Sequence, residues 1–94
     1  MAGAARIEHR GGHAGRRAVL VGWGLDVWEV VETLRNAGNH VGRTARCHGV
    51  PEEVVLAAIA FERAHPGEIA GRIRAERELA ERAHARRRQA GAAP

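Results

Sequence analysis

The side chains of this chain best suited to metal chemistry are its histidines and its single cysteine. His40 and Cys47 are seven residues apart, so on a helix they would share a face, and His48 follows directly. A structural zinc site needs four such ligands, and His9 and His13 lie far away in the sequence. The pattern favours neither a metal nor any other cofactor. We expect Cys47 to pack as a small apolar group and His48 to cover a turn.

Residues for catalysis are equally few. The chain contains no serine and no tyrosine, and its carboxylates are Asp26, one glutamate within residues 1–17 and glutamates on predicted helix faces. His65 and Glu68 could form an acid–base pair, but a histidine before a proline is more often a helix-boundary residue. Gly22 and Gly24 lack the rest of a dinucleotide-binding fingerprint. The sequence therefore favours a binding protein over an enzyme.

The arginines are the third chemical group of interest, because all fifteen basic residues are arginine. Guanidinium groups recognise phosphate and carboxylate bidentately, although a bias toward arginine is also typical of GC-rich genomes. Residues 1–17 hold four arginines against one glutamate, and residues 67–94 hold seven against four. Residues 18–66 hold six carboxylates against four arginines. Two basic ends around a mildly acidic centre predict contact with anionic partners.

The length of 94 residues allows one domain with a thin core. The only aromatic residues are Phe61, Trp23 and Trp28, and we expect the two tryptophans in the core or at a dimer contact. The shortage of large apolar groups favours a homodimer. A lone cysteine, no secretory signal and no apolar stretch of about 20 residues predict a cytoplasmic protein without membrane association.

Three regions position these groups. Residues 1–17 have one large aliphatic side chain, Ile7, and are expected to be a flexible basic arm. Residues 18–66 are expected to contain one short strand, at 18–21, followed by helices. That strand needs a partner, either from the arm or from a second copy.

Local signals place the helices of the central region. Asp26 and Glu29 have the spacing of a capping box, which predicts a helix ending near Gly38. Asn39 could cap a second helix that reaches about residue 47 and stops at Gly49. A third helix is predicted from Pro51, at the first helical position, to about residue 64.

The last region, residues 67–94, is predicted to be an amphipathic, arginine-rich helix and tail. Its apolar stripe is narrow, so we expect the second half to be frayed until a partner binds. The predicted fold class is mainly α, a helix-turn-helix domain of three to four helices with one short N-terminal strand, in a dimer.

The predicted second and third helices, joined through residues 47–51, have the layout of a helix-turn-helix. The outward positions of the third helix are poor readers of base edges, and two are carboxylates that would repel phosphates. They are Glu52, Glu53, Leu56, Ala57 and Ala60. That helix therefore suits a buried element or a dimer surface. If DNA is bound, the candidates for phosphate or groove contact are Arg43 and Arg46, with Arg6, Arg10, Arg16 and Arg17 of the arm.

Two stretches of this chain, RAVLVGWGLDVWEVVETLRNAG and TARCHGVPEEVVLAAIAFERAHPGEI, carry a resemblance to a known family. From residue 17 to residue 73 the order of motifs resembles the domain-of-unknown-function 433 family of antitoxin-like proteins. Members commonly have an Arg-Gly-Thr-Arg-like strand where this chain has Val-Gly-Trp-Gly. The resemblance implies a helix-turn-helix related to VapB-type antitoxins, a dimer, and a PIN-like ribonuclease toxin as partner.

A carboxylate-rich metal site in such a nuclease could accept a guanidinium from residues 67–90, which displaces the metal ion. Residues 67–90 would then fold onto the toxin. The candidate partner-binding residues are Ile69, Arg72, Ile73, Arg77, Leu79, Arg82 and Arg86. Truncation after Pro66 is expected to abolish inhibition without unfolding the core. Two other functions stay open, a stand-alone DNA-binding regulator and a plain dimerisation module.

Overall fold

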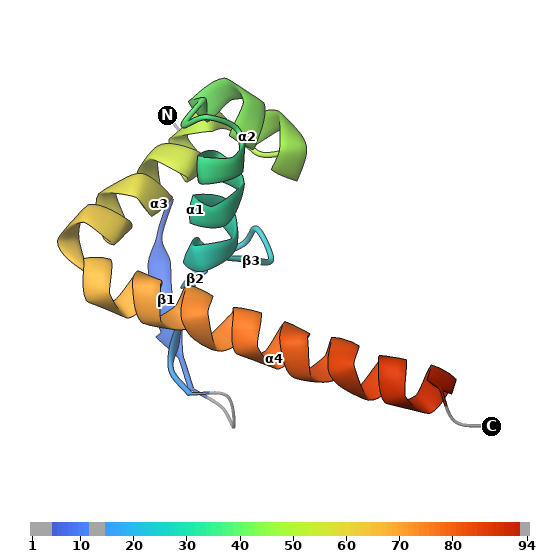
Figure 1. The fold of residues 1–94 in the computed structure, drawn as a ribbon. Coiled ribbons are helices and arrows are strands. Elements are labelled where there is room, and N and C mark those ends of the chain that lie inside the picture. Colours follow the sequence, from blue (N-terminus) through green and yellow to red (C-terminus); the bar gives the residue numbers. More distant parts are fainter. Residues whose placement is uncertain (1–4, 12–14, 93–94) are drawn as a thin grey trace.

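The computed structural model describes residues 5–11 and 15–92. Within these ranges the chain forms a small sheet followed by helices (Figure 1). The strands are β1 (Ile7–Arg10), β2 (Arg17–Leu20) and β3 (Leu25–Asp26). The helices are α1 (Val27–Asn36), α2 (Val41–His48), α3 (Glu52–Ala64) and α4 (Pro66–Ala92). The predicted mainly helical class is confirmed.

The sheet is larger than the sequence predicted. Its strands are antiparallel in the order β1-β2-β3, with Ile7 and Leu25 both paired with Leu20. The expectation of one strand was wrong, and so was that of a flexible arm for residues 7–10. In β1 the side chains of Ile7 and His9 are half-buried and alternate with exposed ones, which is the pattern of a strand with one covered face. The arm therefore supplies the partner that β2 needs.

The start of α1 follows its local signal, whereas the start of α2 does not. The backbone N–H of Asp26 donates to Oε1 of Glu29 at 3.0 Å, as a capping box requires. For α2 the predicted cap, Asn39, was wrong, because Asn39 is in the left-handed region with φ 63°. His40 takes that role, and its Nδ1 accepts from the N–H of Arg43 at 3.0 Å.

The connection between α2 and α3 is short. Gly49 ends α2 with φ 66°, a conformation that glycine adopts without a steric cost. Pro51 is the N-cap of α3, with the helix starting at Glu52, so the prediction that Pro51 is its first helical residue was one position off. The helix ends at Ala64, as the sequence predicts.

The core lies where α1 meets β2 and the other three helices. Its side chains come from every helix and from the middle strand, and most are small or β-branched. The largest fully buried ones are Leu20, Ile69, Val27, Val30, Val55 and Thr44. Because the proximal half of α4 (residues 66–75) provides Ile69 and Ile73, this helix belongs to the folded body rather than to a separate tail.

The distal half of α4 (residues 76–92) continues well beyond the body (Figure 1). The prediction that it is frayed was wrong for the described residues, since α4 is one helix from Pro66 to Ala92. Residues 72–90 contain no proline or glycine and are rich in the helix formers alanine, arginine and glutamate. The projecting helix contributes to an elongated shape of 59 × 28 × 22 Å.

Candidate functional site

The proximal half of α4 is held by apolar and polar contacts with the body. Ile69 and Ile73 are 2% and 4% exposed within the core cluster. In this conformation their side chains pack against the chain's own helices and are not exposed to a partner, as the predicted anchoring would require. Since truncation after Pro66 would remove both residues, it would open the core, which contradicts the expectation that the core survives it.

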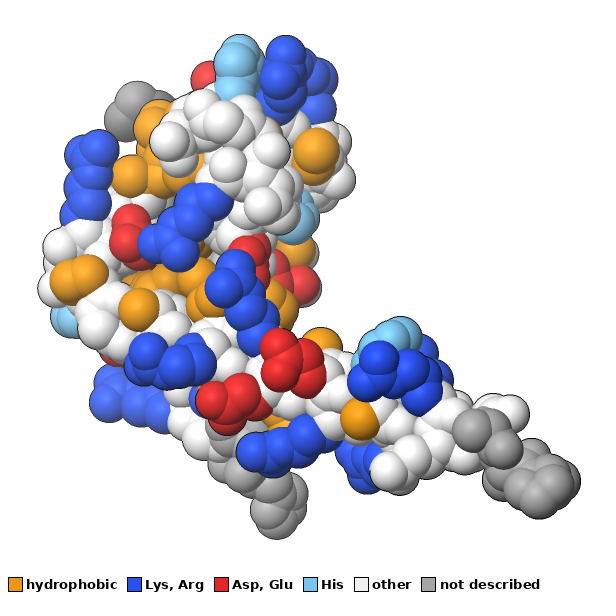
Figure 2. All heavy atoms as spheres, viewed as in Figure 1, with side chains coloured by type: hydrophobic (Ala, Val, Ile, Leu, Met, Phe, Trp, Pro, Cys, Tyr) orange, Lys and Arg blue, Asp and Glu red, His pale blue; other side chains and the backbone are white. Residues whose placement is uncertain are grey.

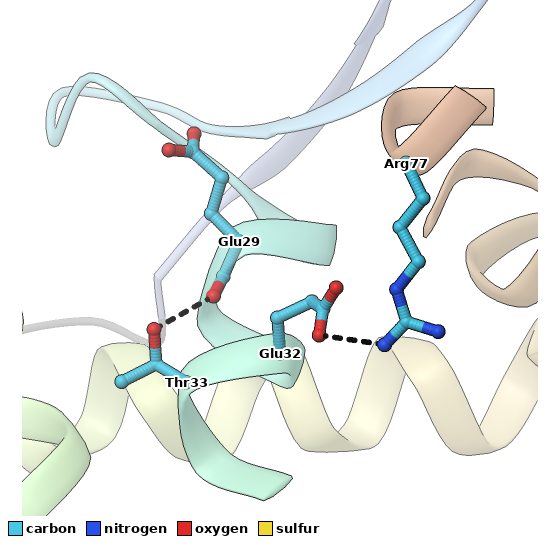
Figure 3. Close-up of polar contacts among 4 residues, drawn as sticks. All are labelled: Glu29, Glu32, Thr33 and Arg77. Atoms are coloured by element: carbon cyan, nitrogen blue, oxygen red, sulfur yellow. Dashed lines mark hydrogen bonds and ion pairs between the residues drawn. The ribbon is translucent and has the colours of Figure 1, made fainter. Parts of the chain in front are cut away.

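Arg77 also serves the body. Figure 3 shows its side chain extending from α4 to α1, where a guanidinium nitrogen lies 3.2 Å from Oε2 of Glu32. The next residue of α1 is Thr33, whose hydroxyl donates to the carbonyl oxygen of Glu29 at 3.0 Å. The same Thr33 hydroxyl lies 2.9 Å from Nε2 of His48. These contacts tie α1 to α2 and α4, so Arg77 is engaged within the chain.

A hollow of about 400 Å³ lies between the end of α1 and α4. It is lined by Arg35, Ala70, Ile73, Arg74, Arg77, Glu78 and Glu81. Arg35 and Arg77 are each paired with a carboxylate, Arg35 at 3.4 Å from Glu62. With two further glutamates in the lining, the hollow has a mixed charge and does not form a concentrated anion site.

The distal half of α4 presents the remaining partner-binding candidates to solvent. Leu79 is 46% exposed, and Arg86 is exposed as well. Arg82 is 70% exposed at its side chain and lies 3.9 Å from Glu78, four residues earlier on the same helix. Figure 2 shows arginine side chains along this helix, with carboxylates near its middle. Arg72, by contrast, is half-buried near the body.

The DNA-binding candidates lie on two separate elements. Arg43 and Arg46 are exposed on α2, and Arg16 and Arg17 are exposed at the start of β2. Arg17 lies 3.7 Å from the carboxylate of Asp26, so part of its charge is balanced within the chain.

His40, His48 and Cys47 have different surroundings at α2. His40 caps α2, His48 contacts Thr33, and Cys47 is exposed, which contradicts its predicted packing as an apolar group. In the part of the chain that the structure describes, no three residues of the types His, Cys, Asp and Glu gather as metal ligands. His13 lies outside the described residues.

The sequence disfavours an acid–base pair of His65 and Glu68, and in the structure Glu68 contacts a distant histidine. Nε2 of His9 on β1 lies 2.7 Å from Oε2 of Glu68 on α4. His65 packs instead against Phe61, with ring centroids 4.5 Å apart. The His9–Glu68 contact joins residues 59 positions apart and fastens the outer strand to α4.

Two large apolar side chains of the body are exposed in addition to Leu79. Trp23, on the turn between β2 and β3, is 42% exposed, so it does not lie in the core, while the alternative of a dimer contact stays a prediction. Leu56 on α3 is 52% exposed, in agreement with its predicted outward position. The first lies on a turn and the second on a helix.

Comparisons with protein families, with curated proteins and with solved structures found no match to this chain. Among the described residues, no helix combines the length and the apolar character needed to cross a membrane.

Proposed function

We propose that this chain is a non-catalytic binding protein of the antitoxin type, which docks on an acidic partner protein through the distal half of α4. The observation that carries this proposal is the uncovered, arginine-rich helix beyond the body, with Leu79 exposed on it. A helix of about 12 to 15 residues is marginally stable by itself in water. Burial of Leu79 against a partner would stabilise the distal half and give its arginines fixed positions.

The partner's chemistry follows from the guanidinium groups. Arg82 and Arg86–Arg88 can each pair bidentately with a carboxylate, and a carboxylate cluster that holds a metal ion offers several. The family resemblance adds the kind of partner, a PIN-like ribonuclease. Among the residues predicted from sequence, the binding set is therefore Leu79, Arg82 and Arg86, because the others serve the body or lie close to it.

The first experiment is co-expression with the product of the adjacent reading frame. We expect the two proteins to co-purify, and we expect the neighbour alone to stop growth and to cleave RNA unless this chain is added. A neighbour that is harmless and does not bind would contradict the proposed partner.

Charge reversal then tests the docking helix. The double substitution Arg86→Glu and Arg87→Glu should abolish co-purification, because it places carboxylates against an acidic surface. The matched control is Arg43→Glu with Arg46→Glu, which makes the same change in net charge on α2 and should leave binding intact. Equal effects of the two pairs would place the docking surface elsewhere.

The second candidate function is DNA binding by α2 and α3 as a helix-turn-helix. It is favoured by Arg43 and Arg46, which are exposed on α2, and opposed by Glu52 and Glu53, which are exposed where α3 begins. Fluorescence anisotropy with a labelled promoter fragment distinguishes the two functions. Affinity that falls steeply with salt and with Arg43→Ala would support DNA binding, whereas no binding at about 50 mM salt would exclude it.

The third candidate is a plain dimerisation module, for which the exposed Leu56 on α3 is the relevant feature. This candidate predicts a dimer that is lost in Leu56→Glu.

A further inference from the structure

The face of α4 that packs on the body continues past it. Alternating spacings of four and three residues along α4 connect seven positions. They are Ile69, Ile73, Glu76, Ala80, Ala83, Arg87 and Ala90. Positions with this spacing form one seam along a helix, as in a coiled coil. Ile69 and Ile73 are buried in the body, whereas Ala80 and the neighbouring Leu79 are exposed. A seam of alanines, with Glu76 and Arg87 at its charged positions and Leu79 beside it, therefore lies open on the projecting half of the helix.

Charge is distributed unequally along the same half. Residues 76–81 contain three glutamates and one arginine, Arg77, which is paired with Glu32 on α1. Residues 82–88 contain four arginines and no acid. A second helix of this sequence is complementary only when it runs antiparallel, since a parallel one would place like charges together. The charges on the distal half of α4 are therefore complementary to those of a second, antiparallel copy of the same helix.

We propose that the distal halves of α4 from two copies of this chain pair antiparallel about a two-fold axis. In this arrangement Glu76 of each copy faces Arg87 of the other, and Ala80 and Ala83 cross near the axis. Such an interface is isologous, so each contact occurs twice. The small alanine side chains permit a close approach, and Leu79 beside the seam covers the contact from water.

This inference goes beyond the proposed function and does not depend on it, since it requires only the chain itself. If both hold, the second copy and the partner protein compete for Leu79 and the neighbouring arginines. The dimer would then cover the distal half of α4 whenever the partner is absent.

Sedimentation equilibrium of the purified full chain, at low and high salt, tests the pairing. We expect a monomer–dimer equilibrium that weakens as salt screens the charges. Leu79→Glu should raise the dissociation constant at least about tenfold, since each dimer loses two buried leucines.

Charge exchange tests the register. Glu76→Arg and Arg87→Glu should each weaken the dimer, because each creates two like-charge contacts. The two together should restore it, since Arg and Glu then face each other again, and this restoration also shows that the variants fold. Glu81→Arg is the matched control, because Glu81 is exposed and is not one of the seam positions, so its reversal should change the dimer little.

Three results would overturn the proposal. The first is a monomer up to about 0.5 mM at low salt, an affinity too weak for a specific interface. The second is a dimer that the double charge exchange does not restore. The third is a dimer insensitive to Leu79→Glu and lost in Leu56→Glu, which would place the interface on α3. The experiment contains only this chain, so each outcome is independent of whether the antitoxin function holds.

Discussion

Replacing Ile73 with alanine tests whether the proximal half of α4 is part of the folded body. Ile73 is 4% exposed and belongs to the same core cluster as Ile69. Truncating a buried isoleucine to alanine costs about 2 to 5 kcal/mol, from the lost burial and the cavity that remains. A chain of this length has a total stability of about 5 to 14 kcal/mol, so this loss is a large share. Leu79→Ala, at a site that is 46% exposed, should cost about 0.5 kcal/mol or less.

Urea unfolding followed by tryptophan fluorescence measures both free energies. Trp28 is half-buried at the start of α1, so its surroundings change when the core opens. The measurement is best made at about 2 µM protein and high salt, where self-association does not add to the apparent stability. An unchanged slope with urea shows that the variants unfold from equally compact states.

Similar costs for Ile73→Ala and Leu79→Ala would refute the reasoning, because α4 would then not be docked. In that case a chain truncated after Pro66 would stay folded. The packing of Ile69 and Ile73 predicts the opposite, that the truncated chain loses its cooperative unfolding transition.

Three further predictions concern the caps and the polar contacts, measured by the same unfolding assay. His40→Ala should cost about 1 kcal/mol through the lost N-cap of α2, while Asn39→Gly should be neutral or stabilising because glycine accepts φ 63°; a reversed order of these two would contradict the cap assignment. Gly49→Ala should cost about 1 kcal/mol, since alanine is strained at φ 66°, and a neutral result would place that turn in another conformation. A double-mutant cycle of Arg77→Ala and Glu32→Ala should give a coupling of about 0.2 to 1 kcal/mol, whereas purely additive effects would show that the pair is not formed in solution.

The two halves of α4 have different roles in both proposals. The proximal half completes the core through Ile69 and Ile73 and is braced by Arg77 and by the contact of Glu68 with His9. This bracing gives the distal half a rigid base. A rigid base lowers the entropy cost of binding, because the direction of the distal half is set before a partner or a second copy binds.

Local chemistry in the sequence determined much of this protein. The capping box of Asp26 and Glu29, the glycine at position 49, and the proline after His65 each act within a few residues. Their helix boundaries could therefore be predicted closely. The outward position of Leu56 was predicted from the sequence, and the amphipathic helix beyond residue 67 was likewise visible in the spacing of its apolar residues.

Only the tertiary structure decided which apolar residues are covered and which strands form. Ile73 and Leu79 are similar in the sequence, but the first lies on α4 where α1 and α3 cover it, and the second lies beyond their reach. The strand β1 has weak local signals and exists through its pairing with β2 and the contact of His9 with Glu68. The division has one physical reason: caps and turns depend on near neighbours, whereas burial and strand pairing depend on residues that folding brings together from distant positions.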